Sequence, residues 1–129
     1  MARLTIALTP DEALTTADLV VEAVTENLDL KKKLFSGYDK IAPAKTIFAS
    51  NTSSLSIESI AEATPERMDR FGGLHFFNPV AVMKLLEVIR IPQTSEETFQ
   101  VSNTYGLKVN KTEKAFSLIG YAKSGKSYR

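Results

Sequence analysis

Residues 18–24 read DLVVEAV, a nearly continuous apolar run with the length of one strand. This pattern is typical of a strand buried on both faces of a parallel sheet, because helices cover each face and keep water away. Asn27 then offers a cap for a helix that runs to about residue 41. The apolar positions of that helix recur at spacings of three and four: Leu30, Leu34, Tyr38 and Ile41. A buried strand followed by an amphipathic helix predicts one unit of an α/β fold.

The same alternation continues along the chain. Strand-like runs occupy residues 46–50 (TIFAS), 70–77 (RFGGLHFF) and 84–90 (KLLEVIR), and a short amphipathic helix occupies residues 56–63 (SIESIAEA). Alternating strands and helices favour parallel strands joined by crossover helices. The sequence therefore predicts an α/β fold with an incomplete doubly wound, Rossmann-like arrangement: a mainly parallel sheet with flanking helices.

Shorter signals lie outside this central part. The run LTIAL at residues 4–8 is expected to form a short strand, followed by a helix that Thr9 caps and Pro10 opens. Near the other end, we expect Thr94 and Glu97 to form a capping box at the start of a helix that Gly106 stops. LKVN at residues 107–110 is expected to form a last strand.

The chain resembles the second half of a nucleotide-binding domain. A doubly wound sheet that binds a dinucleotide begins with a strand, a glycine-rich turn and a helix that holds the pyrophosphate. The pattern GxGxxG does not occur in these 129 residues. We therefore expect residues 1–112 to form a partial domain that lacks the glycine-rich first unit. Residues 113–129 are basic and rich in small side chains, and we expect them to be a disordered tail.

Composition excludes several classes of function. With 16 Lys and Arg against 15 Asp and Glu, the net charge is too small to favour nucleic acid or an anionic membrane surface as a partner. The chain has no cysteine, which excludes disulfides, a thiolate nucleophile and a zinc–thiolate site, and we assign no metal ligands. No apolar run approaches the roughly 18 residues that span a bilayer. Because Asp11 and Glu12 come early, the N-terminus does not resemble a transit peptide.

His75 is the only histidine, and Glu87 follows it in the next predicted strand. If the two strands are neighbours, the side chains can come within hydrogen-bonding reach. A carboxylate that accepts from one imidazole nitrogen fixes the tautomer and stabilises the imidazolium, which leaves the other nitrogen to act as a general base. The alternative is a half-buried histidine bonded to a backbone carbonyl, and spacing alone favours that alternative.

Polar residues at strand ends are further candidates. SNTSS at residues 50–54 follows a buried strand, where ligands bind in open α/β sheets, so Ser53 or Ser54 can donate to a substrate oxygen. The Asn78 amide can polarise a carbonyl. Each of these residues also has an ordinary role in a turn or a helix cap.

Glu26 and Lys31 are weaker candidates. Glu26 stands at the end of the strand and can reach a cofactor, but a glutamate beside the N-terminus of a helix also suits the helix dipole. Lys31 is one of three adjacent lysines, and the ordinary expectation for such a run is a solvated face.

Three stretches together resemble one family. ADLVVEAVTENLDLKKKLF, IFASNTSSLSI and HFFNPVAVMKLLEVIR occur in the order and spacing of the L-3-hydroxyacyl-CoA dehydrogenase family of fatty-acid β-oxidation. The resemblance covers about residues 11–99. It implies that His75 is the general acid/base and Glu87 its partner. It also implies that Ser53 contacts the substrate 3-oxygen beside the nicotinamide, and that Asn78 helps hold cofactor and substrate.

The resemblance implies NAD as cofactor, with Glu26 and Lys31 on its ribose side, and a 3-hydroxyacyl-CoA as substrate. Hydride passes from C3 of the substrate to NAD⁺ while the histidine removes the hydroxyl proton, and the product is a 3-ketoacyl-CoA. The family's glycine-rich turn would lie upstream of this chain, and its helical, dimer-forming domain downstream. We therefore expect little turnover from this chain alone. The mitochondrial matrix is the implied location, with the cytoplasm as the alternative.

Two other functions stay open. A non-catalytic protein would pair with a full-length relative through uncovered sheet or helix faces. A member of the wider 3-hydroxyacid or nucleotide-sugar dehydrogenase group is the third reading, although HFFNP followed by EVI does not point to it.

Overall fold

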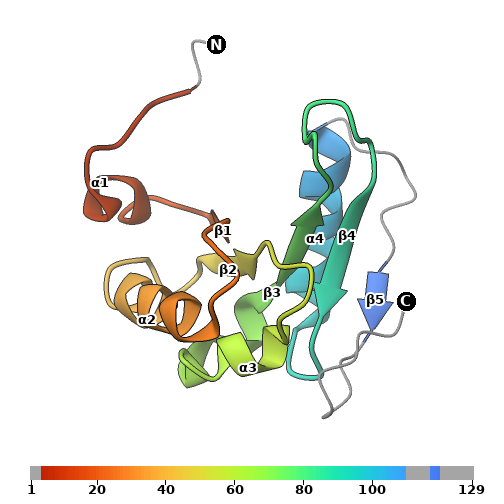
Figure 1. Ribbon diagram of the computed structural model, residues 1–129. Coiled ribbons are helices and arrows are strands. Elements are labelled where there is room, and N and C mark those ends of the chain that lie inside the picture. The colour runs from red at the N-terminus through yellow and green to blue at the C-terminus, as the bar shows by residue number, and fades with distance from the viewer. Residues whose placement is uncertain (1–3, 110–116, 120–129) are drawn as a thin grey trace.

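The protein folds around a mixed sheet of order β1-β2-β3-β4-β5 (Figure 1). The structure, a computed structural model, describes residues 4–109 and 117–119. Neighbouring strands pair in parallel except β3 and β4, which are antiparallel. The strands are β1 (Leu19–Glu22), β2 (Ile47–Ser50), β3 (Phe71–Phe76), β4 (Leu86–Arg90) and β5 (Ser117–Ile119).

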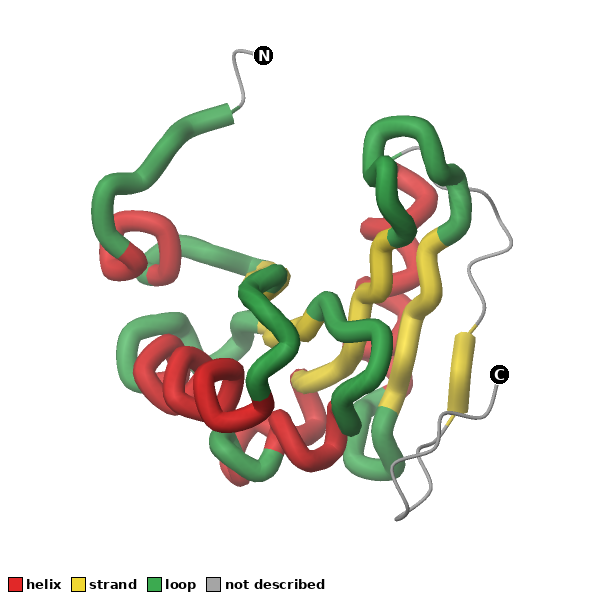
Figure 2. Tube along the Cα trace, viewed as in Figure 1, coloured by secondary structure: helices red, strands yellow, loops and turns green. Residues whose placement is uncertain are grey.

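Helices cover both faces of the sheet (Figures 1 and 2). The helices are α1 (Pro10–Leu14), α2 (Leu28–Asp39), α3 (Ile57–Ala61), the 3₁₀ helix η1 (Pro65–Arg70) and α4 (Glu96–Lys108). Helices α2 and α3 pack on one face, whereas α4 packs on the other against β3 and β4. The predicted α/β fold with a mainly parallel sheet and flanking helices is confirmed.

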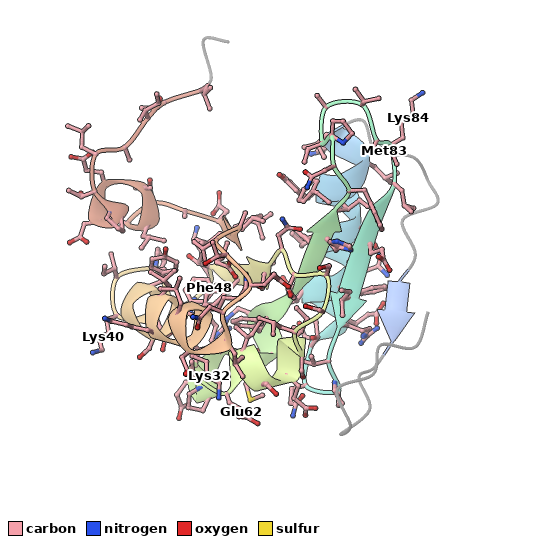
Figure 3. The ribbon with its side chains drawn as sticks, viewed as in Figure 1. Lys32, Lys40, Phe48, Glu62, Met83 and Lys84 are labelled. Carbon is pink, nitrogen blue, oxygen red and sulfur yellow. The ribbon has the colours of Figure 1, made fainter. Side chains whose placement is uncertain are left out.

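Each face has its own apolar core, because side chains alternate along every strand. On the α2 and α3 face, Phe35 of α2 packs on Phe48 and Phe71, with ring centroids 5.4 and 4.8 Å apart. Figure 3 shows Phe48 between α2 and the sheet. On the α4 face, Phe99 packs with Leu74 and its buried neighbours on β4. Strand β2 and the first residues of β3 and β4 are buried on both sides. The apolar residues of β1 are only partly buried, so the burial on both faces predicted from the run at residues 18–24 was wrong: β1 is an edge strand within the described ranges.

Side-chain caps fix where the helices on the first face begin. The Asn27 side chain accepts a hydrogen bond from the Leu30 backbone N–H at 3.0 Å, which confirms the predicted start of α2. Ser56 caps α3 in the same way through the Ser59 N–H, at 3.2 Å. These caps fix where α2 begins after β1 and where α3 begins after the turn that follows β2.

The N-terminal expectation was wrong in two respects. Residues 4–8 form no strand and are exposed, with Ile6 at 85% and Leu8 at 89%. The Thr9 side chain makes no capping bond to α1; instead, Glu12 accepts from the Leu8 N–H at 2.9 Å. Pro10 does open α1, as expected. A short apolar run needs a strand partner, and this run has none among the described residues.

The expected boundaries of α4 were also wrong. Ser95, not Thr94, caps the helix by accepting from Thr98, because the Thr94 hydroxyl donates to the Phe71 carbonyl at 2.7 Å. Gly106 lies inside α4 and packs where a Cβ would meet Leu86 at 2.9 Å. The helix therefore continues to Lys108, through the first two residues of the strand expected at residues 107–110.

Little of the C-terminal segment is described. Strand β5, at residues 117–119, lies inside the segment 113–129 that was expected to be disordered, and it pairs with β4. The other residues of that segment lie outside the described residues.

Candidate active site

His75 and Glu87 form a pair across the antiparallel strands β3 and β4. They are direct partners in the ladder, and His75 Nδ1 lies 2.9 Å from Glu87 Oε1. Their side chains are only 13% and 8% exposed. A charge-assisted bond shielded in this way holds the imidazole plane and favours the tautomer with its proton on Nδ1. The two side chains thus meet, as their spacing allowed.

Gly72 and Gly73 of β3 allow β4 and α3 to pack closely against this strand. A Cβ on Gly72 would lie 2.8 Å from the Ile89 carbonyl oxygen of β4, and one on Gly73 would lie 2.9 Å from Ile57 of α3. Gly73 and His75 share a face because side chains alternate along a strand. The histidine therefore lies on the α2 and α3 face, toward the carboxyl end of β3.

The second imidazole nitrogen is free to act. Within the described ranges, His75 Nε2 has no hydrogen-bond partner. The Phe77 ring packs against the imidazole with centroids 4.5 Å apart, which restricts its rotation further. An oriented imidazole with one unused nitrogen is the arrangement that a general base requires.

Asn51 ties the ends of neighbouring strands together. Its Oδ1 accepts from the Phe76 N–H at 3.0 Å, and its own N–H donates to the Glu22 carbonyl at 2.7 Å. The turn that carries Ser53 is thereby fixed beside the residue that follows His75. Ser53 and Asn78 are themselves exposed, and neither makes a side-chain hydrogen bond to the described residues.

A largely buried cluster of charged and hydroxyl side chains lies at the carboxyl ends of β1 and β2. We call Glu22, Glu26, Lys31, Ser50 and Thr52 the Glu–Lys cluster. Lys31 Nζ lies 2.6 Å from Glu22 Oε2, and both side chains are 0% exposed. Ser50 donates to the other Glu22 oxygen at 2.6 Å. The expectation of a solvated Lys31 was wrong, because the buried carboxylate on β1 draws the ammonium inward.

Glu26 is the exposed member of the cluster, with 39% of its side chain accessible. Its Oε2 accepts from Thr52 at 2.6 Å and from Ser54 at 3.0 Å, and its Oε1 lies 3.4 Å from Lys31 Nζ. Partial burial raises the pKa of Glu26, but these hydrogen bonds and the Lys31 charge outweigh burial and leave the pKa lowered. The carboxylate is therefore ionised at neutral pH and partly open to solvent.

Sequence reasoning missed Glu22, Ser50, Thr52 and Asn51. One signal was available for Glu22. It is the only charged residue in the apolar run at residues 19–24, and a charge in a buried strand requires a partner. The other three residues are ordinary turn formers by type. Their contacts with Glu22, Glu26 and Phe76 depend on which strands are neighbours, and the local sequence does not show this.

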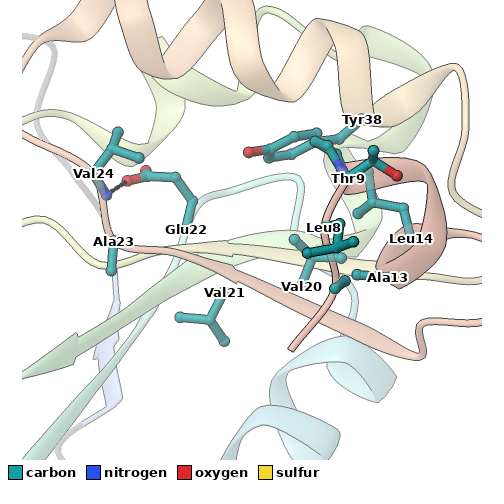
Figure 4. A pocket seen from close by; sticks show the side chains of 12 residues that line it. Leu8, Thr9, Ala13, Leu14, Val20, Val21, Glu22, Ala23, Val24 and Tyr38 are labelled. Carbon is teal, nitrogen blue, oxygen red and sulfur yellow. Dashed lines mark hydrogen bonds between the residues drawn. The ribbon is translucent and has the colours of Figure 1, made fainter. Parts of the chain in front are cut away.

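A pocket of about 530 Å³ opens beside β1, between that strand and the N-terminal segment. Figure 4 shows Leu8 and Thr9 on one side, Glu22 on the other, and the Tyr38 hydroxyl pointing toward Glu22. Burial, and then the Glu22 charge, raise the pKa of Tyr38. Tyr38 therefore stays neutral and can serve as a hydrogen-bond donor.

The described ranges hold neither a cluster of metal ligands nor a membrane-spanning helix. No group of three or more His, Cys, Asp or Glu side chains there is arranged to hold a metal ion. None of the helices there is long and apolar enough to cross a membrane.

The sequence matches a known family along most of its length. Residues 1–114 match the family model described as 3-hydroxyacyl-CoA dehydrogenase, NAD binding domain. The human mitochondrial hydroxyacyl-coenzyme A dehydrogenase is 61% identical over 98 residues, which cover 74% of this chain and 31% of that protein. A probable 3-hydroxybutyryl-CoA dehydrogenase of Bacillus subtilis is 49% identical over 110 residues, 85% of this chain and 38% of that protein.

A solved structure has the same fold. The (S)-3-hydroxybutyryl-CoA dehydrogenase of Ralstonia eutropha superposes with a TM-score of 0.82 at 42% identity, over 89% of this chain and 39% of that chain. This chain thus spans about a third of the length of the curated relatives that it matches.

Proposed function

Because the chain belongs to the 3-hydroxyacyl-CoA dehydrogenase family, we propose that it carries the proton-transfer pair and part of the cofactor site of an NAD-dependent 3-hydroxyacyl-CoA dehydrogenase. The reaction oxidises an (S)-3-hydroxyacyl-CoA to the 3-ketoacyl-CoA in fatty-acid β-oxidation. The observation that carries this proposal is the 2.9 Å pair of His75 and Glu87 at the ligand-binding edge of a mainly parallel sheet.

His75 acts as the base. Glu87 keeps the imidazole proton on Nδ1, so the lone pair of Nε2 is available for the substrate hydroxyl proton. The imidazolium that forms is stabilised by the carboxylate, which is buried on β4 and cannot turn away into water. NAD⁺, when bound, accepts the hydride from C3 of the substrate. In the reverse direction His75 returns the proton to the oxygen.

Ser53 and Asn78 orient the substrate oxygen. Both are exposed at the ends of the strands next to His75, and their side chains keep unused donors. A hydroxyl and an amide N–H that point at the 3-oxygen stabilise the negative charge that develops there. In this proposal the same two side chains also border the nicotinamide.

The residues present fit a dinucleotide on its ribose side. Glu26 is an ionised, partly open carboxylate at the carboxyl end of β1, and a carboxylate there is suited to accept hydrogen bonds from ribose hydroxyls. No GxGxxG turn occurs in these 129 residues, so no pyrophosphate cradle of that type supports the remainder of the cofactor. We expect the isolated chain to bind NAD⁺ weakly and to turn over slowly.

The names of the relatives extend the proposal. The human protein is named mitochondrial, and we propose the mitochondrial matrix as the location. A 3-hydroxyacyl-CoA is the proposed partner molecule, and a homodimer is the proposed state of a complete family protein.

The single histidine allows a direct test. Its imidazole gives one set of NMR signals, which need no assignment. Acetoacetyl-CoA, a 3-ketoacyl-CoA, is expected to shift these signals in a saturable way, whereas free CoA at the same concentration should shift them much less. Ser53→Ala is expected to reduce the response. If millimolar acetoacetyl-CoA together with NAD⁺ leaves the signals unchanged, the proposal is wrong.

A second function is supported by the uncovered strand β1. Within the described ranges β1 pairs only with β2, and the apolar side chains of Leu4, Ile6 and Leu8 in the N-terminal segment are exposed. An open edge of this kind can pair with another chain. The second proposal is therefore a non-catalytic protein that associates with a full-length relative. Size-exclusion chromatography with light scattering, with and without that relative, tests it: a monomer in both cases excludes it.

A further inference from the structure

We propose that Asn51 is a positioning residue for the proposed reaction: its side chain sets where the turn that carries Ser53 stands relative to His75. This inference rests on the proposed function, in which Ser53 and His75 both act on the 3-oxygen of the substrate. It gives Asn51, which takes no part in proton or hydride transfer, the role of aligning the two groups that contact that oxygen.

The ladder between β2 and β3 ends before the histidine. Its last pair is Ser50 with Gly73, whereas β3 continues to Phe76. Within the described ranges, the last three residues of β3 are paired in a ladder only with β4. The position of His75 relative to the turn that follows β2 is therefore not set by strand pairing, and another contact has to set it.

The Asn51 side chain supplies that contact. Its Oδ1 accepts a hydrogen bond from the Phe76 N–H at 3.0 Å, one residue after His75. The bond is partly buried, so water competes with it less than at a fully exposed site. A side-chain carbonyl thus takes the place that a backbone carbonyl of β2 would have in a longer ladder.

The backbone of the same residue is tied to the other neighbouring strand. The Asn51 N–H donates to the Glu22 carbonyl at 2.7 Å, which continues the pairing of β1 with β2 by one residue beyond the pair of Glu22 and Ser50. Strand β2 lies between β1 and β3 (Figure 1). Asn51 therefore joins the ends of all three strands, because β1 holds its main chain and β3 holds its side chain.

The other residues of the turn are bonded toward β1 and not toward β3. Thr52 and Ser54 donate to Glu26, and the Leu55 N–H donates to the Thr52 hydroxyl at 3.0 Å. Among the described residues, no hydrogen bond joins residues 52–55 to β3. In that part of the chain, the Asn51 side chain is thus the hydrogen-bonded link between this turn and the end of β3.

A small displacement of the turn should have a large effect on the proposed reaction. Ser53 orients the substrate oxygen and His75 removes the proton from that oxygen, so both groups have to fit one atom at the same time. The imidazole is held from its other side by Glu87 at 2.9 Å. A displacement of about 1 Å between groups that act together can cost about 100-fold in rate. Without the Asn51 bond, the turn can move while the histidine–glutamate pair stays intact.

Asn51→Ala tests the link in the full 129-residue chain without any ligand. The matched control is Thr94→Val, which removes a side-chain bond at the opposite end of β3, where the Thr94 hydroxyl donates to the Phe71 carbonyl at 2.7 Å. Amide hydrogen exchange is followed by NMR, with the Val88 amide of β4 as the reference. The Phe76 N–H should exchange about tenfold faster in Asn51→Ala and at the unchanged rate in Thr94→Val.

Asn51→Asp separates the acceptor oxygen from the rest of the amide. An aspartate keeps a side-chain oxygen at this position and loses the amide nitrogen. It should restore the protection of the Phe76 N–H. If this N–H exchanges equally fast in the unchanged chain and in Asn51→Ala, or if its exchange stays fast in Asn51→Asp, the inference is wrong.

The second measurement separates positioning from a general loss of structure. Acetoacetyl-CoA binding is followed through the NMR signals of His75, and Ser53→Ala is made in the unchanged chain, in Asn51→Ala and in Thr94→Val. Ser53→Ala should weaken binding about fivefold in the unchanged chain and in Thr94→Val, but less than about twofold in Asn51→Ala, because a displaced hydroxyl has little left to lose. Equal effects in all three proteins overturn the inference.

Failure of acetoacetyl-CoA to shift the histidine signals in any of these proteins contradicts the proposed function. The exchange of the Phe76 N–H then decides alone whether Asn51 holds the turn to β3. If Asn51→Ala does not fold, Asn51→Ser takes its place. The serine side chain is one atom shorter and too short to keep the 3.0 Å contact from the same backbone position, so the same outcomes are expected.

Discussion

His75 and Glu87 stand directly opposite each other on β3 and β4, with 2.9 Å between Nδ1 and Oε1. Because the two strands are hydrogen-bonded along their length, the ladder keeps the two residues opposite each other. The carboxylate thereby controls which imidazole nitrogen carries the proton, and this control is what makes Nε2 a base.

Glu87→Gln should weaken this control over the tautomer. A neutral amide accepts less strongly than a carboxylate and can also donate, so more of the neutral imidazole should carry its proton on Nε2. The ¹⁵N shifts of the single histidine report this directly. Any NADH-linked turnover should fall by about 10²–10⁴-fold, the usual contribution of general acid–base catalysis.

Glu96→Gln is the control for that change. Glu96, the first residue of α4, is an exposed carboxylate that pairs at 2.9 Å with Arg90, which lies on β4 like Glu87. Its substitution should leave the histidine ¹⁵N shifts unchanged. If both variants shift the signals equally, His75 is responding to general charge and not to its partner.

Lys31→Met should destabilise the fold far more than Lys32→Met. The first change leaves Glu22 as an unpaired buried charge, which costs about 3–5 kcal/mol. The second removes an exposed pair with Glu62, worth about 0–1 kcal/mol. Urea unfolding followed by circular dichroism measures the difference. Equal midpoints for the two variants would contradict the burial of Lys31.

The ionisation of Glu26 links stability to acid pH. Its pKa is lowered in the folded protein, so its stabilising contribution is complete above the unfolded value of about 4.3 and is lost as the pH falls through the folded value. Thr52→Val removes one of the bonds that lower the pKa, and the pKa should rise. The midpoint of acid unfolding should move to higher pH. At pH 7 Glu26 should remain ionised in both proteins.

Gly72→Ala and Gly37→Ala should have opposite effects on the free energy of unfolding. A Cβ at position 72 would lie 2.8 Å from a backbone oxygen of β4, and the resulting strain should destabilise by about 1–3 kcal/mol. Gly37 lies exposed in α2, with no atom within 4 Å of the added carbon. Alanine there should stabilise by up to about 1 kcal/mol. Thermal unfolding of both variants checks the signs, and destabilisation by Gly37→Ala would argue against the position of that residue in α2.

The parts of the fold that the sequence predicted are those set by local pattern. The run at residues 18–24, the Asn27 cap and the strands on both sides of Asn78 each follow from neighbouring residues, and β1, α2, β3 and β4 lie there. The pairing of His75 with Glu87 followed once those two strands were taken as neighbours.

The parts that were missed depend on contacts between distant segments. Thr94 and Ser95 are equally good caps by type, and only the Phe71 carbonyl, 23 residues from Thr94, decides between them. Gly106 stays inside α4 because it faces Leu86. Lys31 looks like part of a solvated run until β1 places a carboxylate beneath it. Sequence pattern carries no information about such tertiary contacts.

The two members of the histidine–glutamate pair are separated by only 12 positions, on consecutive antiparallel strands. By contrast, Ser50 reaches Glu22 across 28 positions and an intervening helix. Closing a short loop costs little chain entropy, and contacts of short range form early. We therefore expect the proton-transfer half of the site to assemble before the ribose-binding half during refolding, so that pulsed hydrogen exchange should protect the β3–β4 amides first.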